Sequence, residues 1–198
     1  MGITTGILLF EDAEELDFAG PWEVFTLAAR KEQGDRVVTI APMPGPVRCA
    51  KGLRVIPDHG FEGAPALDVL LVPGGQGTRR EVSNPVVIDW LRKTAARCRF
   101  VTSVCTGSLL VAGAGLAVGK RITTHWAFVE TLRQRGDGAT VVDGVRYVRD
   151  GNLVTAAGVS AGIDMSLWLV GQLYDVAHAR NVQRLMQYDP APPYAADV

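Results

Sequence analysis

In residues 100–114, FVTSVCTGSLLVAGA, a hydrophobic segment is followed directly by a run of small residues, and this pattern is the strongest indication of the fold. Residues 100–104 are typical of a buried strand and residues 106–114 of a helix, so that Cys105 lies at the junction. Similar apolar runs alternate with longer amphipathic segments along the whole chain. This alternation predicts an α/β protein with parallel strand–helix–strand units and helices on both faces of the sheet.

Along the rest of the chain, the same alternation predicts one domain over residues 1–188. Pro21 is expected in the first turn of a helix, where its missing N–H costs nothing, and Asn84 is expected to cap a helix that starts at Pro85. The Pro-rich tail 189–198 cannot be helical. The predicted strands are 3–10, 37–40, 68–72, 100–104 and 153–157, with short edge strands and loops in 42–63, an extended piece at 122–124 and a hairpin at 150–151. The predicted helices are 21–31, 85–97, 106–114, 126–135 and 160–186.

Composition excludes several classes of protein. The 198 residues carry a net charge of −1, and a nucleic-acid-binding protein needs a surplus of Lys and Arg on one face. No apolar run is long enough to cross a membrane, and the start of the chain does not read as a signal peptide. The odd number of widely spaced cysteines (Cys49, Cys98 and Cys105) favours a reducing cytoplasm over a disulfide framework.

In sheets of this kind, ligands bind beyond the carboxyl ends of the strands, and one such end leads into Cys105. Small residues stand two positions before it (Ser103) and two after it (Gly107), as a nucleophile elbow requires. The following helix is expected to lower the pKa of the thiol. The alternative is that Cys105 is only a small hydrophobic residue of the core.

Two further turns fall at the same edge of the predicted sheet, where the carboxyl ends of the strands meet. Pro73-Gly74-Gly75 ends a strand, and its N–H groups could stabilise an anion, although the same residues also make an ordinary turn. Asp17 belongs to a cluster of acids after the first strand and is the best placed of them to act as a proton donor. Such a cluster is equally typical of a solvated surface.

The three histidines do not form a metal-binding pattern. His59 and His178 are expected to be structural or at the surface, whereas His125 lies at a strand–helix boundary and could approach Cys105. Ser160 is expected to cap a helix, since no base is recognisable beside it.

Taken together, these segments resemble the ThiJ/PfpI superfamily, whose flavodoxin-like, doubly wound domain carries a reactive cysteine at such an elbow. Thr106 stands where the peptidase branch has histidine, and Asp17 stands where the glyoxalase or deglycase branch usually has glutamate. The pattern looks most like the isonitrile hydratase branch. The residues that carry the resemblance are DFAGPWEV (17–24), VPGG (72–75), VCTGS (104–108), TTHW (123–126), AAGVSAGID (156–164) and YDP (188–190).

The resemblance implies that Cys105 attacks the terminal carbon of an isonitrile, that Asp17 supplies a proton, and that Thr106 and the Gly75 N–H steady the developing charge. It implies no metal and no cofactor, a small-molecule substrate and a homodimer, while charge and hydropathy already argue against a membrane or nucleic-acid partner. Two alternatives stay open: glyoxalase or deglycase activity on reactive carbonyls, and a non-enzymatic sensor in which Cys105 is oxidised or a ligand is bound. Similar domains also occur in AraC-type regulators, but no helix-turn-helix segment is visible after Met186.

Overall fold

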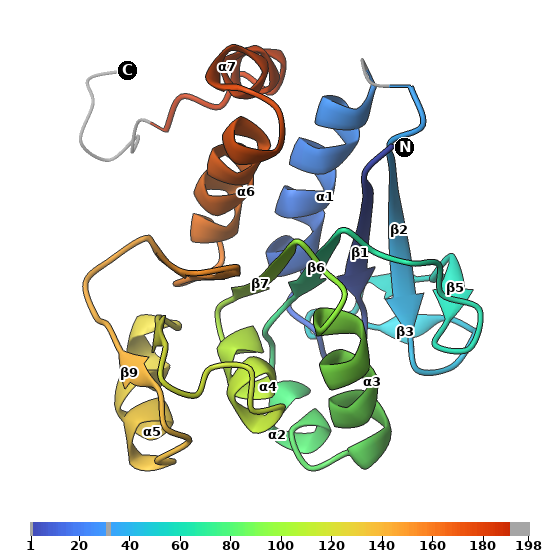
Figure 1. Ribbon diagram of the computed structural model, residues 1–198. Helices are drawn as coiled ribbons and strands as arrows, with labels where there is room; N and C mark the ends of the chain where they lie inside the picture. The colour runs from blue at the N-terminus through green and yellow to red at the C-terminus, as the bar shows by residue number, and fades with distance from the viewer. Residues whose placement is uncertain (1, 31–32, 191–198) are drawn as a thin grey trace.

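A computed structural model describes residues 2–30 and 33–190 of the chain (Figure 1). These residues form a mixed main sheet with the strand order β10-β11-β7-β6-β1-β2-β5. Every neighbouring pair is parallel except β10 and β11, which form the hairpin predicted at residues 150–151. Its strands are β1 (Thr4–Leu8), β2 (Arg36–Ala41), β5 (His59–Gly60), β6 (Val69–Val72), β7 (Phe100–Val104), β10 (Tyr147–Asp150) and β11 (Leu153–Ala156).

The order of the parallel strands is that of a flavodoxin-like sheet, with β1 in the middle and the chain winding outward in both directions. All residues of β1 and β6 are buried, because both faces of the sheet are covered. The predicted α/β architecture with a doubly wound sheet is therefore confirmed.

Helices cover the sheet in two layers (Figure 1). One layer contains α1 (Glu15–Ala29), α6 (Ala161–Leu173) and α7 (Val176–Leu185), and Figure 1 shows α1 and α6 lying side by side. The other layer contains α2 (Thr78–Glu81), α3 (Pro85–Ala95) and α4 (Gly107–Gly113). The remaining elements are β3 (Val47–Arg48), β4 (Arg54–Val55), β8 (Arg121–Ile122), the 3₁₀ helix η1 (Trp126–Phe128), α5 (Val129–Gln134) and β9 (Thr140–Val141).

The first helix begins six residues earlier than predicted. It starts at Glu15, so Pro21 lies in its interior and not in the first turn. Pro21 cannot donate to the carbonyl of Asp17, four residues earlier, but buried packing of the helix outweighs this loss. Glu15 and Asp17 occupy the first turn, where acidic side chains suit the helix dipole. The shift moves Asp17 from a predicted loop onto a helix.

The last predicted helix is two helices. The chain breaks at Tyr174 and Asp175, and the Asp175 carboxylate accepts the N–H of His178 over 2.7 Å as the cap of α7. Ser160 does stand at the N-cap position of α6, but its side chain makes no capping bond. Its hydroxyl instead lies 3.3 Å from Arg146, which also pairs with Asp164 on α6.

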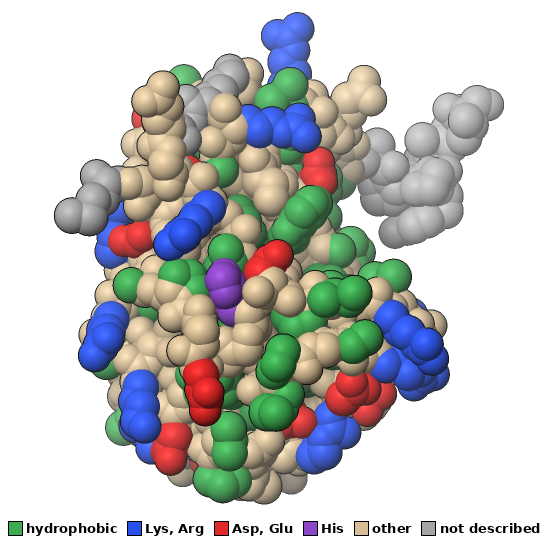
Figure 2. Space-filling model, turned by 90° about the vertical axis from the view of Figure 1, so that its right-hand side faces the viewer, with side chains coloured by type: hydrophobic (Ala, Val, Ile, Leu, Met, Phe, Trp, Pro, Cys, Tyr) green, Lys and Arg blue, Asp and Glu red, His purple; other side chains and the backbone are tan. Residues whose placement is uncertain are grey.

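Other local predictions are confirmed. The Asn84 side chain caps α3 by accepting the N–H of Val86 over 3.1 Å, and residues 42–63 form loops and the short strands β3, β4 and β5. Within residues 2–30 and 33–190, no helix is long and apolar enough to cross a membrane. Figure 2 shows basic, acidic and hydrophobic side chains interspersed over one side of the molecule. Most of the Pro-rich tail lies outside the described residues.

Candidate active site

Cys105 occupies the turn between β7 and α4 with a φ of 55°, a conformation that non-glycine residues rarely adopt. Its N–H lies 3.1 Å from the carbonyl oxygen of Ala156 and 2.7 Å from that of Ala157, so the end of the neighbouring strand holds the turn. A Cβ added at Gly107 would lie 2.2 Å from the Val72 carbonyl oxygen. The small residue predicted two positions after the cysteine is therefore a steric requirement of the elbow.

Asp17 lies beside this turn on the first helical turn of α1. Its side chain is fully buried, and Oδ2 accepts the N–H of Gly74 over 2.8 Å. Oδ1 is buried too and has no hydrogen-bond partner among the described residues. A Cβ at Gly74 would lie 2.6 Å from the Thr106 nitrogen and 2.8 Å from Asp17 Oδ2. Gly74 thus allows the turn after β6 to contact both the acid and the elbow.

The acid and the thiol shift each other's protonation. Burial raises the pKa of Asp17 to about 7, against the opposing effect of the Gly74 N–H, and the charge of Glu14 adds to the rise. Burial and the Asp17 carboxylate raise the pKa of Cys105 to about 12, although hydrogen bonds from Thr106 and the Val159 N–H act the other way. The predicted lowering of the thiol pKa is wrong, because burial beside an acid outweighs the short helix α4. At neutral pH the pair keeps at least one proton.

Thr106 is fixed at the start of α4. Its Oγ1 accepts the N–H of Gly75 over 3.0 Å and lies 3.2 Å from the hydroxyl oxygen of Thr78. The Gly75 N–H, which was expected to stabilise a developing charge, instead donates to Thr106. The N–H of Thr106 itself contacts the Cys105 sulfur. The N–H of Val159 contacts the same sulfur.

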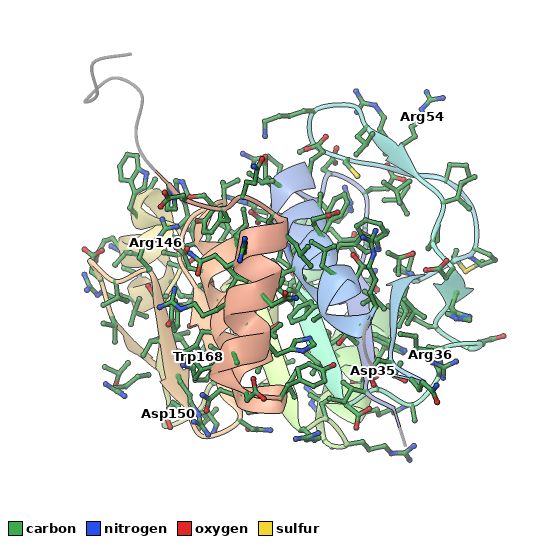
Figure 3. The ribbon with its side chains drawn as sticks, turned by 90° about the horizontal axis from the view of Figure 1, so that it is seen from above. Asp35, Arg36, Arg54, Arg146, Asp150 and Trp168 are labelled. Atoms are coloured by element: carbon green, nitrogen blue, oxygen red, sulfur yellow. The ribbon has the colours of Figure 1, made fainter. Side chains whose placement is uncertain are left out.

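A pocket of about 200 Å³ opens onto Cys105 and Thr106. His125 lines it, as predicted, but makes no hydrogen bond to Cys105 within the described part of the chain; its Nδ1 accepts the N–H of Ala127 over 3.3 Å. A larger cavity of about 380 Å³ lies near Trp168 (labelled in Figure 3) and contains none of these residues. The smaller pocket is lined by Glu14, Gly75, Gln76, Arg79, Cys105, Thr106, His125, Ala127, Phe128 and Val159.

Several lining residues had no role predicted from the sequence, and Arg79 is the most notable: the loop 77–81 was expected to line the pocket, but without any chemical preference. Its Nη1 donates to the Gly75 carbonyl oxygen over 2.8 Å, and the guanidinium lies 4.8 Å from the centroid of the Phe128 ring. Glu14 forms an ion pair with Lys51, which lies in the loop between β3 and β4. The only available signal was that Arg79 follows closely on the Pro-Gly-Gly turn.

The other predicted residues lie elsewhere. His178 Nε2 lies 3.0 Å from the Ala28 carbonyl oxygen between α7 and α1, and His59 belongs to the edge strand β5. Cys49 and Cys98 are buried free thiols away from the pocket lining. No group of three or more His, Cys, Asp or Glu able to hold a metal ion is present in the described ranges.

Comparison with known proteins agrees with this geometry. The model of the DJ-1/PfpI family matches residues 5–172. An isonitrile hydratase of Pseudomonas putida is 43% identical over 98% of this chain and 82% of its own. The crystal structure of a ThiJ/PfpI family protein from Pseudomonas syringae superposes with a TM-score of 0.91 at 34% identity, over 100% of this chain and 80% of that one.

A second kind of relative is longer than this chain. The HTH-type transcriptional regulator GbdR of Pseudomonas aeruginosa is 33% identical over 72% of this chain but only 38% of its own length. The match with the family model, the near full-length relative and the elbow cysteine agree with one another. The chain belongs to the DJ-1/PfpI family.

Proposed function

We propose that the protein hydrates an isonitrile to an N-substituted formamide, with Cys105 as nucleophile and Asp17 as acid and base. The observation that carries the proposal is the buried Asp17 carboxylate beside Cys105. One of its oxygens is held by Gly74, and the other has no protein partner within the described residues. The relationship to an isonitrile hydratase at 43% identity supports the choice of substrate.

In the first step, the Cys105 sulfur bonds to the terminal isonitrile carbon while the proton of the Cys105–Asp17 pair moves to the same carbon. The product is a thioimidate, and Asp17 is left as a carboxylate. Because the pair keeps at least one proton at neutral pH, no external acid is needed. A carboxyl group with a pKa of about 7 is well matched to this transfer.

In the second step, water adds to the thioimidate carbon. The Asp17 carboxylate removes a proton from this water, and the substrate nitrogen gains one. The tetrahedral adduct then collapses, the carbon–sulfur bond breaks, and the hydroxyl proton returns to the Cys105–Asp17 pair. The N–H groups of Thr106 and Val159, which contact the sulfur, would stabilise charge on it as it leaves.

The two alternative functions fit less well. A peroxide sensor reacts through a free thiolate, which the proton kept by the Cys105–Asp17 pair at neutral pH disfavours, whereas the proposed hydration uses that proton. A glyoxalase or deglycase would use the same nucleophile, but that branch usually has glutamate where this chain has Asp17. Assays with the two kinds of substrate distinguish the two activities.

The test is conversion of an aryl isonitrile to its formamide by the purified protein, beside Cys105→Ala and Asp17→Ala. We expect turnover by the wild type and its loss in both variants, with circular dichroism confirming that they fold. Cys98→Ala is the matched control, because Cys98 is a buried thiol outside the pocket lining. Turnover by Cys105→Ala would overturn the mechanism. Turnover of methylglyoxal but not of isonitriles would favour the glyoxalase reading.

A further inference from the structure

The pocket wall contains a cation to which the proposed chemistry gives no role. Arg79 is the one Lys or Arg among the described lining residues. Its Nη1 is anchored to the Gly75 carbonyl oxygen at 2.8 Å and lies 3.2 Å from Thr78 Oγ1 and 3.4 Å from Thr106 Oγ1. The Phe128 ring supports the guanidinium from one side. An exposed arginine is thus held in place next to the elbow.

One edge of the anchored Arg79 guanidinium makes no hydrogen bond to the described part of the protein. Within the described part of the chain, no carboxylate lies within ion-pair distance of Arg79, and neither Nε nor Nη2 has a hydrogen-bond partner. Nε and Nη2 form the side of a guanidinium that binds a carboxylate through two parallel bonds. The neighbouring Arg80, by contrast, pairs with Asp12 and Glu81.

The acids near the pocket do not compete strongly for Arg79. Glu14, which also lines the pocket, forms an ion pair with Lys51. Asp17 is fully buried behind the turn, and its raised pKa keeps a proton available there. A volume of about 200 Å³ also lies below the range typical of drug-sized ligands. The wall therefore suits a small ligand with one negative group.

We propose that Arg79 binds a carboxylate of the substrate, so that the preferred substrates are small isonitriles carrying a carboxylate a few bonds from the isocyano group. This inference rests on the proposed hydratase function and narrows its substrate class. The reacting carbon would meet Cys105 while the carboxylate occupies the Nε/Nη2 edge of Arg79. The ion pair between Arg79 and the substrate carboxylate would then orient the isocyano group toward Cys105.

The test compares kcat/KM for 4-isocyanobutanoate and for its methyl ester, which differ in charge at the same distance from the reacting carbon. We expect the wild type to prefer the acid. In Arg79→Gln the preference for the acid over the ester should fall by about 10- to 100-fold, mainly through KM of the acid, as expected for loss of a charged hydrogen-bonded pair. Arg79→Lys keeps the charge without the fork and should retain an intermediate preference.

Arg97→Gln is the matched control. It removes the same charge from an exposed residue that precedes β7, at the sheet edge opposite the pocket, and should leave the preference unchanged. A second measurement needs no variant: higher salt should raise KM of the acid in the wild type more than KM of the ester.

Three outcomes would overturn the inference, and they are distinguishable. If the wild type hydrates the ester as well as the acid, the carboxylate site is wrong and the hydratase function stands. If Arg79→Gln lowers turnover of both compounds equally, Arg79 only supports the turn. If the wild type hydrates neither compound nor an aryl isonitrile, the proposed function fails, and this inference fails with it.

Discussion

The Gly74 N–H donates to Asp17 Oδ2 over 2.8 Å, and this bond determines which oxygen of the carboxylate remains for chemistry. The other oxygen is buried without a partner among the described residues, beside a thiol whose pKa the carboxylate raises. The turn after β6 thus orients the carboxyl group that lies beside the cysteine after β7.

The close approach at Gly74 makes this position intolerant of a side chain. In Gly74→Ala the new Cβ would meet the Thr106 nitrogen at 2.6 Å and Asp17 Oδ2 at 2.8 Å, so both must move. We expect turnover to fall by more than tenfold and stability to fall by roughly 1–3 kcal/mol, as for overpacking. Gly63→Ala is the control, because nothing lies within 4 Å of its added Cβ. Equal activities of the two variants would contradict the proposed constraint.

The raised pKa of Asp17 makes stability depend on pH. The ordinary value of 3.8 applies when the chain is unfolded, and the folded value is about 7, so the folded state binds the proton more tightly. This contribution is fully present below about pH 4 and is lost as the pH rises to about 7. Asp17→Asn removes the titration and keeps an oxygen for the Gly74 N–H.

We therefore expect Asp17→Asn to lose less stability than the wild type between pH 5 and pH 8, by on the order of a few kcal/mol. Urea unfolding at both pH values measures the difference. Parallel pH dependences of the two proteins would show that Asp17 titrates normally.

The same pair predicts how readily Cys105 is alkylated. With its pKa raised to about 12, Cys105 should react slowly with iodoacetamide at pH 8. Asp17→Asn removes the carboxylate charge that favours the neutral thiol, and labelling of Cys105 should accelerate by about tenfold for each pKa unit recovered. Peptide mass spectrometry follows each cysteine, with Cys49 and Cys98 as internal controls. Unchanged labelling of Cys105 would show that the two groups are uncoupled.

Thr106 should act through its hydroxyl oxygen. Thr106→Val keeps the shape but removes the acceptor of the Gly75 N–H, and an unsatisfied N–H costs about 1–3 kcal/mol. We expect turnover to fall by about tenfold or more, and Thr106→Ser to recover most of it. Steady-state kinetics of both variants decide the point. Equal activity of the valine and serine variants would show that the oxygen is dispensable.

The N-termini of α6 and α7 offer a matched test of helix capping. Asp175→Ala removes a bond of 2.7 Å to the His178 N–H and should cost about 1 kcal/mol of stability. Ser160→Ala removes a hydroxyl that makes no capping bond to α6 and should cost less. Thermal unfolding measures both, and neither change should alter turnover. A larger loss in Ser160→Ala would mean that the contact with Arg146 outweighs a helix cap.

Much of this arrangement could be predicted from the sequence, because it depends on local patterns. The alternation of apolar runs and amphipathic segments predicts the sheet, and small residues around Cys105 predict the elbow. The prediction that the first helix starts at Pro21 was wrong, because tertiary burial of α1 outweighs the local cost of an internal proline. The break at Asp175 was missed because its neighbours on both sides are compatible with a helix.

The pocket wall was less predictable for a different reason. Arg79, Glu14 and Phe128 come from three separate loops and helix ends, and their proximity depends on how the loops pack. The pKa of Cys105 was mispredicted for the same reason. The start of a helix after Cys105 can be predicted from neighbouring residues in the sequence. The burial of Cys105 beside Asp17, in contrast, depends on the assembled core.

The position of Gly74 against both Asp17 and Thr106 has a consequence for folding kinetics. The three residues belong to segments that meet only when β1, β6 and β7 have paired in parallel, each pairing closing a long loop. Helical structure and local hydrophobic clusters can form before that pairing is complete. During refolding, turnover should therefore return with the slowest phase, after the helical signal in circular dichroism. Recovery of catalytic activity would then be a stricter test of native strand register than any spectroscopic measure of secondary structure.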